Sequence, residues 1–134
     1  MSNREILFRA KRKSDGEWIF GNLLRTDDDG ICIIQNHVPH HLLKNYEVDS
    51  ETICQYTGLT DKNGRKIFEG DIVQYSKIGA VGKVVWYEGD YIGFAVDDID
   101  DSFQQYDKEL FDKHEVIGNI FDNPELLEVE NETD

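Results

Sequence analysis

Short apolar runs alternate with polar, glycine-containing segments along the whole chain, and this spacing predicts β-strands rather than helices. Each run is only a few residues long and is rich in Val, Ile, Tyr, Phe or Trp. No run is long enough to cross a bilayer as a helix. The strands are expected at residues 6–10, 17–24, 31–34, 52–56, 71–75, 81–87, 91–96 and 115–121.

Gly-containing turns separate these runs, and the strongest turn signal is Asn63-Gly64. Both residues tolerate positive φ, so the pair predicts a type I′ turn. A β-branched residue is poorly tolerated there, and Gly64→Val is expected to destabilise the fold. The segment around Pro39 could begin a short helix or be an irregular loop, and a short helical turn is expected after Pro124.

The strand pattern predicts a mainly β protein in two parts. Residues 1–60 are expected to form an N-terminal antiparallel meander, joined to an SH3-like small β-barrel over residues 61–127. Residues 128–134 lack apolar anchors and are expected to fray as an acidic tail. Alternation along the strands predicts a core made by Trp18, Phe20, Ile33, Ile72, Val84, Trp86, Phe94 and Ile117. A buried Trp86 would make Trp86→Ala cost about 3–5 kcal/mol.

The chain is strongly acidic, and the charge is unevenly distributed. Its formal net charge is −14. Residues 97–134 contain 14 acids and 2 bases, whereas residues 1–96 contain 14 acids and 12 bases. Such a surface repels nucleic-acid phosphates and anionic membranes and attracts basic proteins. The favoured interpretation is a solvated acidic face that only keeps the protein in solution. A specific basic partner, or mimicry of the charge of DNA, is the alternative.

Two sequence blocks stand out: Gln-Tyr-Thr-Gly-Leu at residues 55–59 and Ile-Gly-Asn-Ile at residues 117–120. Together with residues 6–10, Trp18 with Gly21, 61–64, 67–73, Val116 and 121–127, they resemble the YopX family of bacteriophage and prophage proteins. The resemblance implies a mainly β fold and a phage or prophage protein in the cytoplasm of a bacterial host. It implies no particular activity, and the segments 37–41 and 97–112 depart from the family pattern.

A histidine-rich loop is the first candidate site. His37, His40 and His41 could bind a metal together with Cys32 or Cys54. A zinc site needs four converging ligands and usually contains close cysteine pairs, which this sequence lacks. Both cysteines lie in apolar strand runs, where a buried free thiol is normal. The favoured interpretation is therefore a surface loop, free thiols and no metal or cofactor, in keeping with a cytoplasmic protein that has no signal peptide.

Acidic turns and isolated nucleophiles give little support for catalysis. The two acidic segments, at 27–30 and 97–101, lack the spacing of an EF-hand loop. Their carboxylates are Asp27, Asp28, Asp29, Asp97, Asp98, Asp100 and Asp101. Ser76 and Ser102 lack the setting of a nucleophile, and His114 and Glu115 should point to opposite faces of a strand. The chain is therefore expected not to be an enzyme.

Two basic clusters are the remaining candidates, and both fall in expected hairpin loops. They are Arg9, Lys11, Arg12 and Lys13 near Trp18, and Lys62, Arg65 and Lys66. Loops of this kind can contact nucleic acid, but the net charge of the chain opposes approach to DNA.

The sequence as a whole favours a non-enzymatic phage accessory protein that acts as a small protein–protein interaction module. The partner would be basic if the acidic third of the chain is the recognition surface. Replacing Asp97, Asp98, Asp100 and Asp101 with Asn would then slow association. The alternatives are a nucleic-acid-binding module using the basic loops and a small metal-dependent enzyme, and a homo-oligomer stays open.

Overall fold

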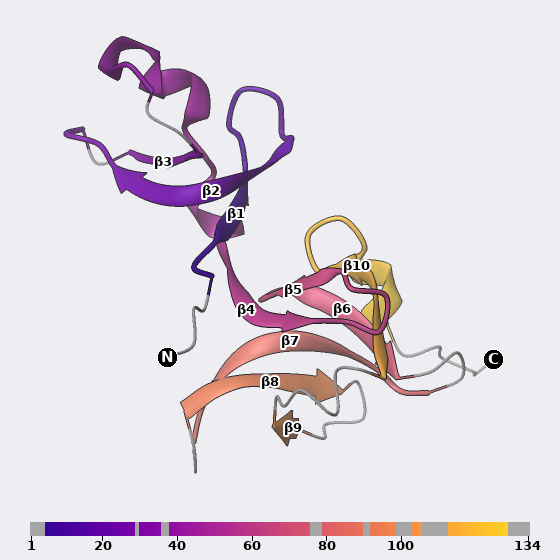
Figure 1. The fold of residues 1–134 in the computed structure, drawn as a ribbon. Helices are drawn as coiled ribbons and strands as arrows, with labels where there is room; N and C mark the ends of the chain where they lie inside the picture. The colour runs from indigo at the N-terminus through magenta and orange to yellow at the C-terminus, as the bar shows by residue number, and fades with distance from the viewer. Residues whose placement is uncertain are drawn as a thin grey trace. The chain divides into compact units, whose positions relative to one another are not determined.

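The computed structural model describes residues 5–28, 30–35, 38–75, 79–89, 92–98, 103–105 and 113–128. The chain divides into two compact units, Met1–Tyr56 and Thr57–Asp134, here called unit 1 and unit 2 (Figure 1). Both are built from antiparallel strands, and the helical segments are short 3₁₀ turns. The mainly β prediction is confirmed.

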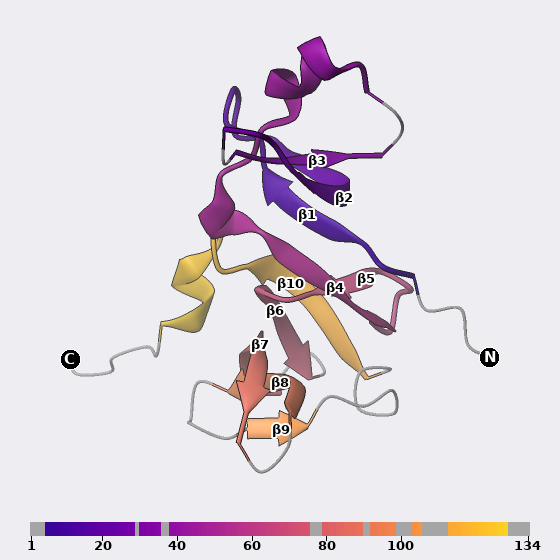
Figure 2. The same ribbon diagram turned by 90° about the vertical axis from the view of Figure 1, so that its left-hand side faces the viewer.

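Unit 1 is an antiparallel meander followed by two 3₁₀ turns. Its strands are β1 (Phe8–Lys11), β2 (Trp18–Arg25), β3 (Ile31–Ile34) and the first residues of β4 (Cys54–Thr60), and they are arranged in the order β3-β2-β1-β4. The 3₁₀ turns are η1 (His40–Tyr46) and η2 (Ser50–Thr52). Figure 2 shows the meander with η1 beside β3. Of the two alternatives for the segment around Pro39, the structure has the short helical one, and Pro39 is the residue that precedes η1.

The core of unit 1 is small. Ala10, Ile33 and Val48 are buried together, and partly buried Phe8, Ile19, Ile31 and Ile53 pack against them. Ile19 therefore faces inward on β2, which turns its neighbour Phe20 to the opposite face, because side chains alternate along a strand. Phe20 is 39% exposed and Trp18 is half-buried. The prediction that Trp18 and Phe20 face the core is therefore wrong by one residue along β2, because Ile19 faces the core instead.

Unit 2 contains a five-stranded antiparallel sheet in the order β10-β6-β7-β8-β9 (Figure 2). The strands of this sheet are β6 (Asp71–Tyr75), β7 (Val81–Glu88), β8 (Ile92–Asp98), β9 (Phe103–Gln105) and β10 (His114–Asn119). β5 (Lys66–Phe68) is not part of it and pairs with β4. The 3₁₀ turn η3 (Pro124–Leu127) follows β10, as expected. Among the described residues the sheet is open, with β9 and β10 at its edges, so the SH3-like barrel is not confirmed.

The core of unit 2 is formed by small branched side chains from four strands and β5. Ile67, Val73, Val84, Val96 and Val116 are buried together. Leu59 and Phe94 are partly buried against this cluster. Of the predicted core residues, Ile72 and Val84 are buried here, as Ile33 is in unit 1, whereas Phe94 and Ile117 are half-buried.

Trp86 is not a core residue, although it lies on the face of the sheet that forms the core. Alternation places it on the same side of β7 as Val84, and it pairs across the strands with Phe94. The paired register of β6 with β7 covers only Val81–Lys83 on β7, so β6 does not extend beside Trp86. The indole is consequently 47% exposed. The predicted burial of Trp86 is wrong because the β7–β8 hairpin continues beyond the core.

A buried carboxylate, Asp61, connects the β4–β5 turn to β10. Asp61 is 4% exposed, and its Oδ1 accepts hydrogen bonds from the backbone N–H groups of Asn63 and Arg65, both at 2.9 Å. Its Oδ2 accepts from the N–H of Val116 at 2.9 Å. This one side chain therefore satisfies backbone donors from two segments that are distant in the sequence.

The glycine of the same turn has the expected backbone conformation in a different turn type. Gly64 has φ +83°. Its N–H donates to the carbonyl of Asp61 at 2.9 Å, which places Lys62 and Asn63 at the two central positions. The N–H of Asp61 donates to the carbonyl of Arg65. This is the pattern of a type I turn followed by a left-handed glycine, not of a type I′ turn centred on Asn63-Gly64.

Candidate functional site

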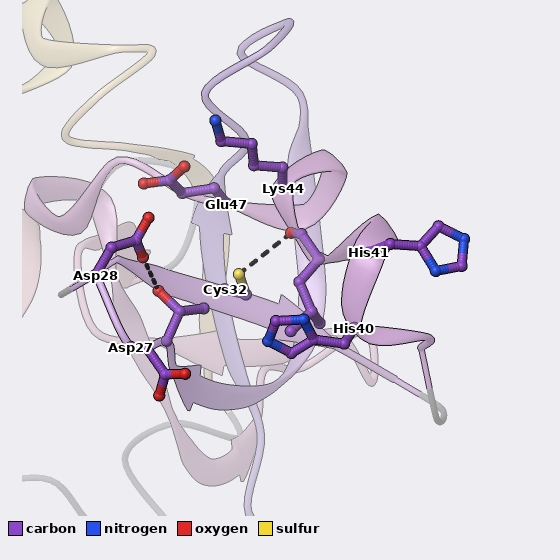
Figure 3. A pocket seen from close by; sticks show the side chains of 9 residues that line it. Asp27, Asp28, Cys32, His40, His41, Lys44 and Glu47 are labelled. Atoms are coloured by element: carbon purple, nitrogen blue, oxygen red, sulfur yellow. Dashed lines mark hydrogen bonds between the residues drawn. The ribbon is translucent and has the colours of Figure 1, made fainter.

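A hollow in unit 1 lies between the β2–β3 turn and η1. It has a volume of about 400 Å³ (Figure 3). The residues that line it, here called the acidic pocket, are Thr26, Asp27, Asp28, Cys32, His40, His41, Leu43, Lys44 and Glu47. The β2–β3 turn supplies the first three, β3 supplies Cys32, and η1 with its C-terminal cap supplies the others.

The floor of the acidic pocket is neutral and largely apolar. Cys32 is 1% exposed, and its thiol donates to the carbonyl of Leu43 at 3.3 Å. Burial raises the pKa of the Cys32 thiol, and the negative charges of Glu47 and Asp28 raise it further. The side chain is therefore a protonated thiol near neutral pH. A thiol nucleophile needs the opposite environment, one that stabilises the thiolate.

The β2–β3 turn holds its carboxylates through Thr26. The Thr26 hydroxyl donates to Asp28 Oδ1 at 2.6 Å and accepts from the N–H of Gly30 at 3.0 Å. The bond from Thr26 lowers the pKa of Asp28, because it stabilises the ionised carboxylate. Asp28 is thus charged at neutral pH, and its position is set by the turn that a Thr followed by Asp residues forms.

A third carboxylate, Glu47, follows η1 and lies beside the β2–β3 turn. Glu47 Oε2 accepts from Lys13 Nζ at 3.2 Å, in a pair that is exposed to solvent. Lys44 also lines the pocket, and the His41 ring points away from the other labelled side chains (Figure 3). The pocket therefore combines three carboxylates and one lysine with a neutral floor.

The structure brings together only part of the histidine and cysteine group suggested by the sequence. Cys32, His40 and His41 line the same pocket, whereas Cys54 is buried elsewhere and donates to the carbonyl of Thr52 at 3.3 Å. His37 lies outside the described residues. Within the part of the chain that the structure describes, no three His, Cys, Asp or Glu side chains are grouped as metal ligands.

The other carboxylate and nucleophile candidates do not converge on this pocket. His114 is 3% exposed and packs edge-on against Tyr75 at 5.3 Å, whereas Glu115 is half-buried and lies 3.8 Å from Lys62 Nζ. Asp97 lies on β8, and for Asp98 only the backbone is described. The remaining candidates lie outside the described residues: Asp29, Ser76, Asp100, Asp101 and Ser102.

Many of the basic side chains expected to reach a nucleic acid have partners within the chain. Arg12 forms a two-pronged pair with Asp15, with distances of 3.1 and 2.7 Å, and Lys13 reaches Glu47. The Arg9 guanidinium lies over the Trp18 ring, 4.8 Å from its centroid. Lys11 Nζ lies 5.4 Å from the same centroid.

Sequence reasoning missed Thr26, Leu43, Lys44 and Glu47 as pocket residues. Thr26 had a readable signal, because Ser or Thr before a turn of Asp residues commonly bonds to the turn backbone. No sequence signal identified Glu47 as a pocket residue, because its place beside the β2–β3 turn depends on how η1 returns the chain to β3. The isolated bridge between Cys32 and Glu47 shows that return.

The described part of the chain contains no helix with the length and apolar character needed to cross a membrane.

Comparison with known proteins assigns the family. The profile of the YopX protein family matches residues 7–128, nearly the whole chain. The chain belongs to the YopX family. This confirms the resemblance seen in the sequence blocks, and no curated protein matches the chain. The crystal structure of protein EF1440 from Enterococcus faecalis is similar, with a TM-score of 0.55 and 27% sequence identity. The alignment covers 94% of this chain and 100% of that one.

Proposed function

We propose that this YopX chain is a phage-associated, non-enzymatic binding module, and that its acidic pocket receives a lysine or arginine side chain of a protein partner. The observation that carries the proposal is the composition of the pocket: three carboxylates, among them Asp28 with its lowered pKa, against one lysine, and a neutral thiol and Leu43 at the floor. A long cationic side chain needs both features, because it has an apolar stem and a charged end.

The same pocket is poorly suited to catalysis. Its one cysteine is bonded to a backbone carbonyl, and burial favours the protonated thiol. A catalytic cysteine is activated by an adjacent base or a neighbouring positive charge, whereas Glu47 and Asp28 both act on Cys32 in the opposite direction. Binding is therefore the function that this arrangement of charges supports better.

The nucleic-acid alternative receives less support from the basic loops than the sequence suggested. Arg12, Lys13 and Lys62 each lie within ion-pair distance of a carboxylate of the same chain. Exposed pairs of this kind are weak and can be broken, but they lower the positive potential of the loops. Family membership accords with a phage or prophage origin, and we place the protein in the cytoplasm of the bacterial host.

A titration followed by two-dimensional NMR on the full chain tests the pocket. The probes are N-acetyl-arginine amide and N-acetyl-lysine amide, with N-acetyl-glutamate amide as the negative probe. The cationic probes should shift the backbone signals of Asp28, Cys32 and Leu43. Asp27→Asn combined with Asp28→Asn should weaken binding about tenfold, the effect of losing about 1.4 kcal/mol.

The matched control removes the same charge elsewhere in unit 1. Glu17→Gln combined with Glu51→Gln changes two exposed carboxylates that do not line the pocket. Its affinity for the cationic probes should equal that of the wild type. An equal loss of affinity in both double variants would mean that only net charge matters. A single-stranded DNA oligonucleotide that shifts the signals of Lys11 and Lys13 would favour the nucleic-acid alternative.

A further inference from the structure

The tip of the β7–β8 hairpin in unit 2 carries exposed apolar side chains on the side of the sheet that elsewhere forms the core. Trp86 is 47% exposed and Ile92 is 71% exposed. Their neighbours on the same face are Glu88 and Phe94, since Trp86 pairs with Phe94 and Glu88 pairs with Ile92. These four residues are here called the hairpin tip.

The hairpin tip is exposed because the neighbouring strands stop before it. On one side, the paired register of β6 covers Val81–Lys83 of β7. On the other side, β9 pairs with Ala95–Asp97 of β8. The remaining residues of the two strands pair in register with each other. A two-stranded ribbon has no adjoining strand to cover its apolar face, and a group of neighbouring exposed apolar side chains is typical of an interaction site.

The side chains of the hairpin tip are arranged around the indole. The ring of Phe94 meets Trp86 edge-on, with centroids 5.1 Å apart and planes at 83°. The indole N–H donates to Glu88 Oε2 at 3.0 Å. The electron-rich ring and the carboxylate are therefore held together, and a carboxylate can accept more than one hydrogen bond.

The charge of unit 2 identifies the kind of partner. Unit 2 contains nineteen acids and seven bases, a net charge of −12, whereas unit 1 contains nine acids and seven bases. A second copy of the chain would bring the same negative unit toward the tip, and an acidic or phosphate-bearing partner would be repelled. A positively charged segment is attracted by both the unit and Glu88.

We infer that the hairpin tip is a docking surface for an arginine-bearing segment of a partner protein, with the guanidinium against Trp86 and Glu88 and an adjacent apolar side chain against Ile92. Arginine fits better than lysine, because its planar group can stack on an indole and bond a carboxylate at the same time. Unit 1 contains the same kind of stack internally, where Arg9 lies over Trp18. This inference concerns unit 2 and stands independently of the acidic pocket in unit 1.

The test is a two-dimensional NMR titration of the full chain with a ten-residue peptide that contains two Arg-Leu pairs and is blocked at both ends. The probes for comparison replace each Arg by Lys or by Glu. The indole N–H signal of Trp86, assigned with Trp86→Phe, should shift with the arginine peptide. It should shift less with the lysine peptide and not at all with the glutamate peptide. The effect should weaken as salt is added.

Three variants separate recognition from folding. Trp86→Ala should raise the Kd about tenfold, as expected for an aromatic residue at the centre of an interface. Glu88→Gln keeps an oxygen for the indole N–H and removes the charge, and it should raise the Kd about threefold. Ile92→Thr keeps a β-branched residue, and it should weaken binding by a similar factor without changing the melting temperature by more than about 2 °C.

The control is Glu115→Gln, which removes one charge on β10, two strands away from β7 in the sheet order. It should leave the Kd unchanged. Equal weakening by Glu115→Gln and Glu88→Gln would overturn the inference in favour of net charge alone. An unshifted Trp86 signal, or wild-type affinity in Ile92→Thr and Trp86→Ala, would also overturn it. So would a Trp86 signal that shifts with protein concentration together with a dimer mass, because the occupant would then be a second copy.

Discussion

The two units of this chain use their carboxylates in different ways. In unit 1, Asp28 and Glu47 stand at the rim of a pocket and are open to solvent on one side. In unit 2, Asp61 and Asp71 are 4% and 1% exposed and accept hydrogen bonds from backbone N–H groups. The same residue type therefore offers a binding surface in one unit and holds turns together in the other.

The two units also differ in the size of their apolar cores. Unit 1 buries three apolar side chains as a cluster, one of them only an alanine, whereas the cluster of unit 2 contains five branched side chains. Unit 2 also carries nearly all of the excess negative charge. A larger core and buried carboxylates tied to the backbone allow unit 2 to tolerate a repulsive surface that a smaller core would tolerate less well. Each unit contains one tryptophan, so the two can be followed separately.

The largest expected effect is loss of the buried carboxylate of unit 2. Asp61→Ala leaves three backbone N–H groups without their acceptor, and hydrogen bonds to a charged group contribute more than neutral ones. We expect a loss of about 4 kcal/mol in the unfolding free energy of unit 2. Urea unfolding monitored by Trp86 fluorescence, in a Trp18→Phe background, measures it.

Asp61→Asn is the matched variant for that experiment. It keeps one acceptor oxygen and should lose only part of the stability. The comparison between the units fails if Asp61→Ala unfolds at the same urea concentration as the wild type. It is sharpened if the transition of unit 1, reported by Trp18 in a separate Trp86→Phe background, stays unchanged while that of unit 2 moves.

The next effect contrasts two apolar side chains of unit 2, Ile67 in the core and Trp86 beyond it. Ile67 is fully buried, so Ile67→Ala should cost about 3 kcal/mol. Trp86→Ala should cost about 1–2 kcal/mol, because the indole is half exposed and loses mainly its edge contact with Phe94. Urea titrations followed through NMR signals of β6 give both values. A larger loss of stability for Trp86→Ala than for Ile67→Ala would indicate that the indole is buried in the core.

Local chemistry in the sequence was enough to find most of the strands, the helical turn after Pro124 and the left-handed Gly64. It left open whether the segment around Pro39 is a short helix or an irregular loop. It did not determine which face of β2 turns inward, because Trp18, Ile19 and Phe20 are all apolar and an alternating pattern cannot be read from three apolar neighbours. For Trp86 the face was right and the burial was wrong. Burial depends on where β6 ends, and that is a property of strand pairing rather than of the residues around Trp86.

The sequence predicted only some residues of the candidate site. Cys32, His40 and His41 were grouped by the sequence and do share the acidic pocket, although as lining residues rather than as a ligand set. The sequence did not predict that Asp61 is buried, because an Asp before Lys-Asn-Gly is typical of an exposed turn. Its hydrogen bond from the N–H of Val116 depends on the placement of β10, which the local sequence does not determine. Charge counts predicted the acidic unit but could not separate structural carboxylates from those available to a partner.

The smallest expected effect is the loss of stability in unit 1 when acid breaks the ion pair between Arg12 and Asp15. The hydrogen bond from Arg12 and the N–H of Glu17 lower the pKa of Asp15 from 3.8 to about 2. Because the folded pKa is lower than the unfolded one, the carboxylate favours folding above pH 3.8, and this contribution disappears as the pH falls toward about 2. Both groups are solvent-exposed, so salt should reduce the effect.

Asp15→Asn keeps an oxygen for the N–H of Glu17 and removes the charge, so it should flatten the dependence of unit 1 stability on pH in this window. Unfolding monitored by Trp18 fluorescence in a Trp86→Phe background, from pH 5 to pH 2, compares the variant with the wild type. Arg12→Gln should flatten the curve to the same extent, and the double variant should add nothing further, since both remove one interaction. Superimposable acid curves for all four proteins would show that the pair contributes nothing to unit 1. A change of the same size in unit 2, reported by Trp86 in a separate Trp18→Phe background, would show that the two units do not unfold separately.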